Sequence, residues 1–303
     1  MKIGKYILWA VLFLLAAVAA GVGLYLYPAW KSAGAMEDRM SLSYRAFELE
    51  VELDREAIPA EQAQMFGILA GLTGIEEEAL YRLSIKGGME EDRIHFTVCP
   101  YGRTEPLFEL YLSDDMKLIN ETMVYDAVRS HLAGRFGLLG YLMPVQEETV
   151  YLTLEQVEKL FGADLSAYTE LRLQQARRSI TAKEYFLLFA MMSREKQGEG
   201  YRFTLDTEEA RLCFEVIYGG KADWARMELQ AQNPADLLDK AGSAFPWLDQ
   251  WLPGVEVRGL KSISFTLTPE ERGTVTMPTN LASQEIVDTI AKLRGWIQET
   301  FGK

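Results

Sequence analysis

The two histidines, His95 and His131, are the first candidates for catalysis or metal binding. His95 lies in a segment where apolar residues alternate with others, so we expect its side chain to share a face with Thr97 and Cys99. His131 borders the apolar stripe of a predicted helix. Neither histidine belongs to a metal-ligand spacing such as HExxH, and one histidine near one cysteine is a poor zinc site. The sequence therefore predicts no metal ligand.

Carboxylates are densest in three runs, Glu76–Glu78, Glu90–Asp92 and Glu147–Glu148. Glycoside hydrolysis needs two carboxylates at a set distance in a cleft, and nothing in the linear sequence singles out such a pair. The serine elbow GxSxG, the phosphate loop and the dinucleotide motif GxGxxG are all absent. We therefore expect no catalytic residue and no cofactor, and we expect the chain not to be an enzyme. An acid/base hydrolase is kept as a third hypothesis.

The net charge of −13 narrows the class of partners. The first 35 residues contain three lysines and no acidic residue, so all of the acidic residues lie in the remainder of the chain. A body of this charge repels phosphate backbones and anionic lipid headgroups. We expect no nucleic-acid partner, and any membrane contact beyond an anchor should be apolar.

The strongest signal is an uncharged N-terminal segment of 21 residues, Ile7–Tyr27. As a helix with about 1.5 Å rise per residue it spans roughly 31 Å, the thickness of a bilayer core. Pro28 is predicted to end this helix. Residues 1–30 are thus a predicted membrane anchor, residues 31–40 a linker, and residues 41–303 an α+β domain.

Flanking residues orient the anchor. Lys2 and Lys5 precede the segment, so the positive-inside rule places the N-terminus in the cytoplasm and the bulk of the chain outside, as a single-pass protein of the cell membrane. A cleaved signal sequence is the alternative, because Val18–Ala20 and Ala33–Ala35 both resemble cleavage sites. Cys99 and Cys213 form a disulfide in one interpretation and are two small buried strand residues in the other.

The body begins with strands. Tyr44–Leu53 alternates apolar and acidic residues with period two, which predicts a half-buried strand. A helix is predicted from Pro59, with Gly71 and Gly74 at its end. Four short strands follow, with Gly87–Gly88 and Ser113–Asp115 as turns between them, so neighbours should be antiparallel; the segments are 81–86, 94–98, 107–112 and 117–120.

Helices dominate the middle of the chain. A helix is predicted over 124–135, and capping boxes at Thr153–Gln156 and Thr181–Glu184 open two more. The run Tyr185–Met192 is apolar on every side, so we expect a central helix that is buried all round, with a buried strand as the alternative. Further strands are predicted at 201–205, 211–218, 224–231, 255–267 and 273–277, with Gly219–Gly220 and Pro269–Arg272 as turns, and a final helix at 283–301.

The late strand with its proline, Gly273–Pro278, and the run Leu110–Asp115 that turns back into Lys117–Ile119 are similar to the bacterial lipoprotein-carrier superfamily, the LolA- and LppX-like envelope proteins. The resemblance covers roughly residues 41–280. It implies a curved antiparallel sheet, like a half-barrel, packed on interior helices, with a lipid or other apolar ligand in the hollow. This chain lacks the lipidated cysteine and has a longer helical middle.

Two functions follow as expectations. The first is a membrane-anchored extracytoplasmic module, held by residues 7–27, that binds a lipid or other apolar ligand. The second is a structural or interaction protein of the cell envelope, with a filled core and an envelope protein as its partner. An apolar cavity would favour the first, and a filled core with an exposed apolar patch would favour the second.

Overall fold

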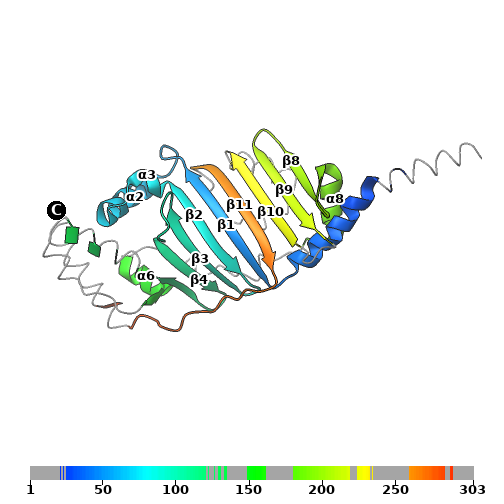
Figure 1. Cartoon of the computed structure of the whole chain (residues 1–303). Coiled ribbons are helices and arrows are strands. Elements are labelled where there is room, and N and C mark those ends of the chain that lie inside the picture. The colour runs from blue at the N-terminus through cyan, green and yellow to red at the C-terminus, as the bar shows by residue number, and fades with distance from the viewer. Residues whose placement is uncertain are drawn as a thin grey trace, which may run out of the picture. The chain divides into compact units, whose positions relative to one another are not determined.

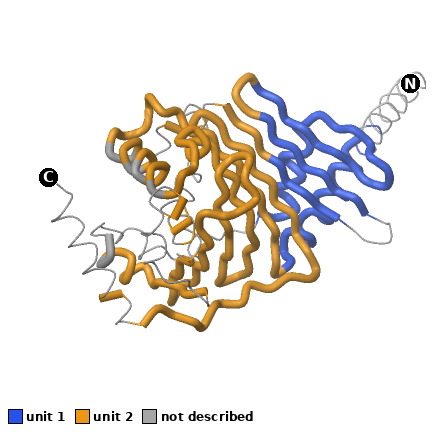
Figure 2. The backbone as a smooth tube through the Cα atoms, turned by 60° about the vertical axis from the view of Figure 1, so that its left-hand side comes forward, with its two compact units in different colours: residues 1–42, 178–207, 211–228 blue, residues 43–177, 208–210, 229–303 orange. Residues whose placement is uncertain are grey.

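The computed structural model describes most of the chain. Its strands form one large antiparallel sheet that is not closed, accompanied by a few helices (Figure 1). The α+β class is thereby confirmed at this level. The chain divides into two compact units, coloured in Figure 2. The described residues are 25–120, 149–161, 180–218, 224–232 and 259–283, with isolated positions at 21, 23, 122, 126, 129, 130, 133, 134, 234, 287 and 288.

Unit 2 contains seven strands and three helices among the described residues, with residues 43–177, 208–210 and 229–303 assigned to it. The strands are β1 (Tyr44–Leu53), β2 (Arg82–Met89), β3 (Arg93–Pro100), β4 (Phe108–Ser113), β5 (Lys117–Asn120), β6 (Tyr151–Thr153) and β11 (Leu260–Glu270). The helices are α2 (Ala60–Thr73), α3 (Glu77–Leu80) and α6 (Leu154–Phe161).

Unit 1 comprises residues 1–42, 178–207 and 211–228. Its described elements are a helix over residues 25–40, called here the N-terminal helix, α8 (Ala182–Met191), β7 (Ser193–Gln197), β8 (Gly200–Asp206) and β9 (Ala210–Ile217). β10 (Trp224–Gln232) is divided between the units.

The strand order is β6-β5-β4-β3-β2-β1-β11-β10-β9-β8-β7. Strands one to six thus lie side by side in chain order, and so do strands seven to eleven. Among the described strands, β1 and β11 are the neighbours that do not follow each other in the chain. They pair antiparallel along nearly their full length, with Leu49 opposite Phe265 and Val51 opposite Ile263.

Local sequence signals predicted several elements correctly. β1 and β5 have the expected bounds, and α2 ends at Gly74, whose φ of 69° is the left-handed conformation that glycine adopts most easily. The capping box of α8 is formed, since the Thr181 N–H donates to Glu184 Oε2 at 2.9 Å and the Glu184 N–H donates to Thr181 Oγ1 at 3.4 Å.

Three segments predicted among the strands are wrong, and one of them is the turn at Pro269–Arg272, since Pro269 and Glu270 lie inside β11. Gly87 and Gly88 lie inside β2 rather than in a turn, and the chain turns at residues 90–92 instead. A Cβ atom at Gly87 would collide with the backbone of β3, so glycine is required there by close approach of a neighbouring strand. Residues 273–277 are not a strand, although their composition alternates.

The N-terminal helix continues through Pro28, which was predicted to end it, and covers residues 31–40, predicted as a linker. Its Ala29, Ala33 and Met36 are buried in the core of unit 1. A proline inside a helix costs about 3 kcal/mol, and burial of this helix face offsets that cost. A cut after Ala35 would remove two of these residues from the core.

The helix α8 is not buried all round, contrary to expectation. Tyr185 and Phe189 face the core of unit 1, where the Phe189 ring stacks on Phe203 with 4.2 Å between centroids. Leu187 and Met191 are exposed. Apolar composition on every side therefore did not predict burial on every side.

No helix in the described residues is long and apolar enough to cross a membrane. Residues 1–20, which hold most of the predicted anchor, lie outside the described part, as do most of the predicted helices 124–135 and 283–301 and the whole of Gly219–Gly220.

Helix α2 offers a matched pair of glycine substitutions. Gly71 is exposed inside the helix, where a Cβ atom would meet nothing within 4 Å, whereas Gly74 caps the helix with positive φ. We expect Gly71→Ala to raise the free energy of unfolding by about 0.5–1 kcal/mol and Gly74→Ala to lower it by about 1 kcal/mol. Chemical denaturation of both variants measures the difference, and equal effects would contradict the assigned helix end.

Candidate functional site

One face of the sheet in unit 2 is apolar. The antiparallel registers align every second side chain of each strand into rows that cross the strands. The residues of this apolar face are Leu267, Phe47, Phe96, Leu110, Ile119 and Leu152 in one row, Phe265, Leu49, Ile85, Val98 and Phe108 in the next, and Ile263, Val51 and Leu83 in a third.

Most of the apolar face is only half-buried. Phe47 and Leu152 are buried, but the other side chains of the face keep intermediate exposure. Leu49, Ile85 and Phe265 belong to none of the buried clusters found in the described residues. Large apolar side chains in the interior of a sheet are normally covered by a second layer. These three side chains therefore form a half-buried apolar surface.

Helices and neighbouring segments cover the apolar face near β4 to β6. There α2 and α3 bury Leu80 and Leu107 and pack against Phe108. At β5 and β6, Leu152 is buried with Ala282 and Val287. The first cluster lies at the end of β1 and β2, where the Leu53 N–H donates to the Tyr81 carbonyl at 2.7 Å, and neither cluster includes Leu49, Ile85 or Phe265.

Gly87 stands in the first row between Phe47 and Phe96, whose ring centroids are 6.4 Å apart. A side chain at Gly87 would collide with the backbone of His95 and with Phe96, because β3 approaches closely there. Glycine at this position therefore allows the two rings to lie near each other across β2.

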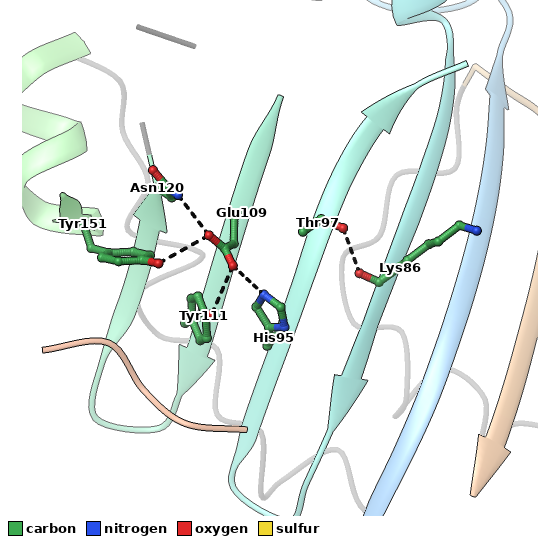
Figure 3. A network of polar contacts seen from close by, with 7 residues as sticks. All are labelled: Lys86, His95, Thr97, Glu109, Tyr111, Asn120 and Tyr151. Atoms are coloured by element: carbon green, nitrogen blue, oxygen red, sulfur yellow. Dashed lines mark hydrogen bonds and ion pairs between the residues drawn. The ribbon is translucent and has the colours of Figure 1, made fainter. Parts of the chain in front are cut away.

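The opposite face of the same strands carries a polar cluster centred on Glu109 (Figure 3). Glu109 Oε1 lies 2.9 Å from His95 Nε2 and accepts a hydrogen bond from the Tyr111 hydroxyl at 3.0 Å. Its Oε2 accepts from Asn120 Nδ2 at 2.9 Å and from the Tyr151 hydroxyl at 3.4 Å. The four partners come from β3, β4, β5 and β6, so the register of the whole sheet edge assembles this cluster.

The pKa shifts in the cluster fit a stabilising role better than a role in acid/base catalysis. The hydrogen bond from His95 is the largest of several that lower the pKa of Glu109 to about 2, and burial raises the pKa of Tyr111. A carboxylate that stays ionised at neutral pH is a poor general acid and a weak base. The ring of His95 stacks on Tyr111 at 4.3 Å, and none of its described contacts is with a serine, threonine or cysteine.

A small polar hollow of about 150 Å³ lies on the same polar face of unit 2. It is lined mainly by charged and hydroxyl or amide groups of β1, β2, β10 and β11, including Glu50, Ser84 and Gln230. Glu52 at its rim already binds Lys261 at 2.6 Å and Ser262 at 3.3 Å. The hollow is too small for an extended ligand and is not the apolar cavity that would favour a ligand-binding module.

The residues singled out from sequence lie apart from one another. His95 shares its face with Thr97, as predicted (Figure 3). Glu76–Glu78 lie at the start of α3, and Glu90–Asp92 form the turn between β2 and β3. His131 and Glu147–Glu148 fall outside the described residues. Cys99 in β3 and Cys213 in β9 are free thiols.

The described part of the chain contains no group of three or more His, Cys, Asp or Glu side chains that could hold a metal ion. Sequence reasoning missed Glu109, although its spacing offered a signal. Glu109 and Tyr111 alternate with Phe108, Leu110 and Leu112, so two polar side chains share the face that His95 was expected to take.

The low pKa of Glu109 makes a prediction about acid stability. Its folded pKa of about 2 lies below the ordinary value of 4.5, so the cluster stabilises the fold fully above pH 4.5 and loses that contribution as the pH falls towards 2. The contribution is on the order of 3 kcal/mol, because one pKa unit is worth about 1.4 kcal/mol and a side chain that is only 16% exposed is little screened by solvent.

We expect Glu109→Gln to lower stability at pH 7 and to flatten its loss between pH 4.5 and 2, as followed by urea unfolding at several pH values. Glu105→Gln, at an exposed position four residues earlier, is the control and should leave the pH profile unchanged. A Glu109→Gln profile parallel to that of the unmodified chain would show that the carboxylate does not carry this dependence.

Comparison with known proteins gives no further assignment. No protein-family model, no curated protein and no solved structure matches this chain.

Proposed function

We propose that this chain is a membrane-anchored extracytoplasmic module that binds a lipid or another apolar ligand on the apolar face of unit 2. The observation that supports the proposal best is the partial exposure of Leu49, Ile85 and Phe265 in the interior of the sheet. At about 25 cal/mol per Å², covering such side chains stabilises a complex with an acyl chain.

The ligand class follows from the chemistry of the face. Its rows contain aliphatic and phenylalanine side chains, and the neighbouring acidic residues of β1 point to the opposite face, where Lys86 lies 3.0 Å from Glu48. A ligand on the rows of Phe47 and Leu49 therefore meets apolar side chains, and the row beyond them on the same face carries Arg45 in β1 and Lys117 in β5. The expected occupant is an acyl chain or a similarly extended apolar molecule rather than a charged metabolite.

The polar cluster supports a binding module over a hydrolase. All four donors around Glu109 are used within the protein, and its lowered pKa removes it as a proton donor at neutral pH. The acid/base hypothesis would need a second carboxylate near a carboxyl group whose pKa is raised. The pKa of Glu109 is lowered instead.

The anchor completes the proposal. Residues 7–27 hold the chain in the membrane, and the N-terminal helix links them to unit 1 through the buried Ala29 and Ala33. Removal of a signal sequence after Ala35 would take part of the core away, which favours an uncleaved anchor over that cut. The half-barrel with interior helices, implied by the resemblance to lipoprotein carriers, is the finer architecture that this proposal adopts.

The test is native mass spectrometry of the full chain released from mild detergent, with organic extraction of co-purified molecules. The full chain is needed because truncation at residue 36 would remove core residues. We expect a ligand at a fixed stoichiometry. Phe265→Asp should reduce its occupancy at least tenfold, since a carboxylate on the apolar face adds a desolvation cost above about 1.4 kcal/mol.

Ser264→Asp is the matched control, because Ser264 neighbours Phe265 in β11 but points to the opposite face. It should retain the ligand, and thermal unfolding of both variants checks that each remains folded. Equal lipid content in the two variants would mean that the lipid is only annular. A chain that purifies without ligand and keeps the same mass after lipid is added would contradict the proposal. An envelope protein would then be the expected partner of the apolar face.

A further inference from the structure

The helix α8 has an apolar side that the protein does not cover. Its inner side packs against the core of unit 1, with Phe189 stacked on Phe203 and 5.4 Å from Phe214. Its outer side presents Leu187, which is 53% exposed, and Met191, which is 71% exposed. A surface helix of a soluble protein carries polar residues on its outer side. The composition of α8 therefore indicates an apolar environment there.

The N-terminal helix, which packs beside α8, also exposes large apolar side chains. Tyr25, Tyr27 and Trp30 are all more than half exposed. Together with Leu187 and Met191 they form what we call the juxtamembrane patch. Single exposed apolar residues need no explanation, but a group of large ones contributed by two packed helices marks an interaction site.

Two contacts fix how these helices lie against each other. The ring of Trp30 meets that of Phe186 edge to face at 5.5 Å. Arg194, just after α8, donates to the Tyr25 carbonyl at 2.6 Å, and its guanidinium lies 4.8 Å from the Tyr25 ring centroid. The N-terminal helix and α8 therefore run in opposite directions. Leu187 and Met191, which lie between residues 186 and 194, are level with residues 25–30.

The position of the patch along the chain identifies its partner. Tyr25 and Tyr27 are the last residues of the uncharged segment 7–27, so the patch begins where the predicted anchor ends. Trp and Tyr concentrate at the boundary between acyl chains and headgroups, and Arg and Lys there extend their charges to water. Arg194 and Lys31, whose Nζ lies 4.3 Å from the Tyr218 ring, fit that arrangement.

We propose that the juxtamembrane patch lies in the interfacial layer of the bilayer that holds the anchor, so that α8 is a second membrane contact. This inference rests on the anchor of the proposed function and not on the ligand. The contact is apolar, which suits a chain whose net charge of −13 repels anionic headgroups. It also holds unit 1 in a fixed orientation on the membrane, because one helix alone leaves rotation about its axis free.

The experiment is site-directed spin labelling of the full chain in nanodiscs of phosphatidylcholine. The two native thiols are first removed as Cys99→Ser and Cys213→Ala. Nitroxides are then attached in separate variants at Met191→Cys and Leu187→Cys. The control is Met116→Cys, an exposed methionine in the turn between β4 and β5 that lies outside the patch.

Oxygen concentrates in lipid, and a nickel chelate stays in water. We expect the ratio of oxygen to nickel collision rates to be at least threefold higher at positions 187 and 191 than at position 116. Circular dichroism of each labelled chain checks that it is folded, and the second patch position replaces any label that disturbs α8.

Each other outcome has a distinct meaning. Equal ratios at all three positions, in a chain that floats with lipid vesicles, would overturn the inference while leaving the anchor intact. Dipolar broadening between labels at position 191 would assign the patch to a second copy of the chain and overturn it as well. A chain that does not float with vesicles lacks the anchor, and the inference then fails together with that part of the proposed function.

Discussion

The pairing of β1 with β11 is the constraint on which unit 2 depends. Every other neighbouring pair among the described strands is consecutive in the chain, whereas this pair joins distant residues such as Glu52 and Lys261, which are 209 positions apart. Closing so long a loop costs conformational entropy that only a well-matched interface offsets. The match consists of apolar residues opposite one another, such as Val51 and Ile263, over nearly the full length of both strands.

The register set by this pairing also separates the chemistry of the two faces. Because successive side chains alternate, a shift of one residue would move Leu49 and Phe265 to the polar face and Glu50 to the apolar one. Charges on the polar face find partners across the strands, as Glu48 does with Lys86 and Glu52 with Lys261. Among the described residues, the rows of Phe47, Leu49 and Val51 on the apolar face contain no charged side chain, and this asymmetry is the physical basis of the ligand-binding proposal.

Sequence alone predicted features whose causes are local. Alternation gave β1, the Thr181 capping box gave the start of α8, and a single glycine gave the end of α2. It failed where a distant neighbour decides. The backbone of β3 decides whether the chain turns or stays extended at Gly87. The exposure of the outer side of α8 depends on which elements pack against the helix. The cluster around Glu109 needed the register of four strands, since its partners Asn120 and Tyr151 lie 11 and 42 residues further along the chain.

The order of the strands has a consequence for biosynthesis. At about 5–20 residues per second, the ribosome takes on the order of 10–40 s to make the chain between β1 and its partner β11. Throughout that interval one edge of β1, with its unpaired backbone groups and its leucines, is free to pair with any other extended chain. The edge of β1 that faces β11 thus stays unpaired until the last strand arrives.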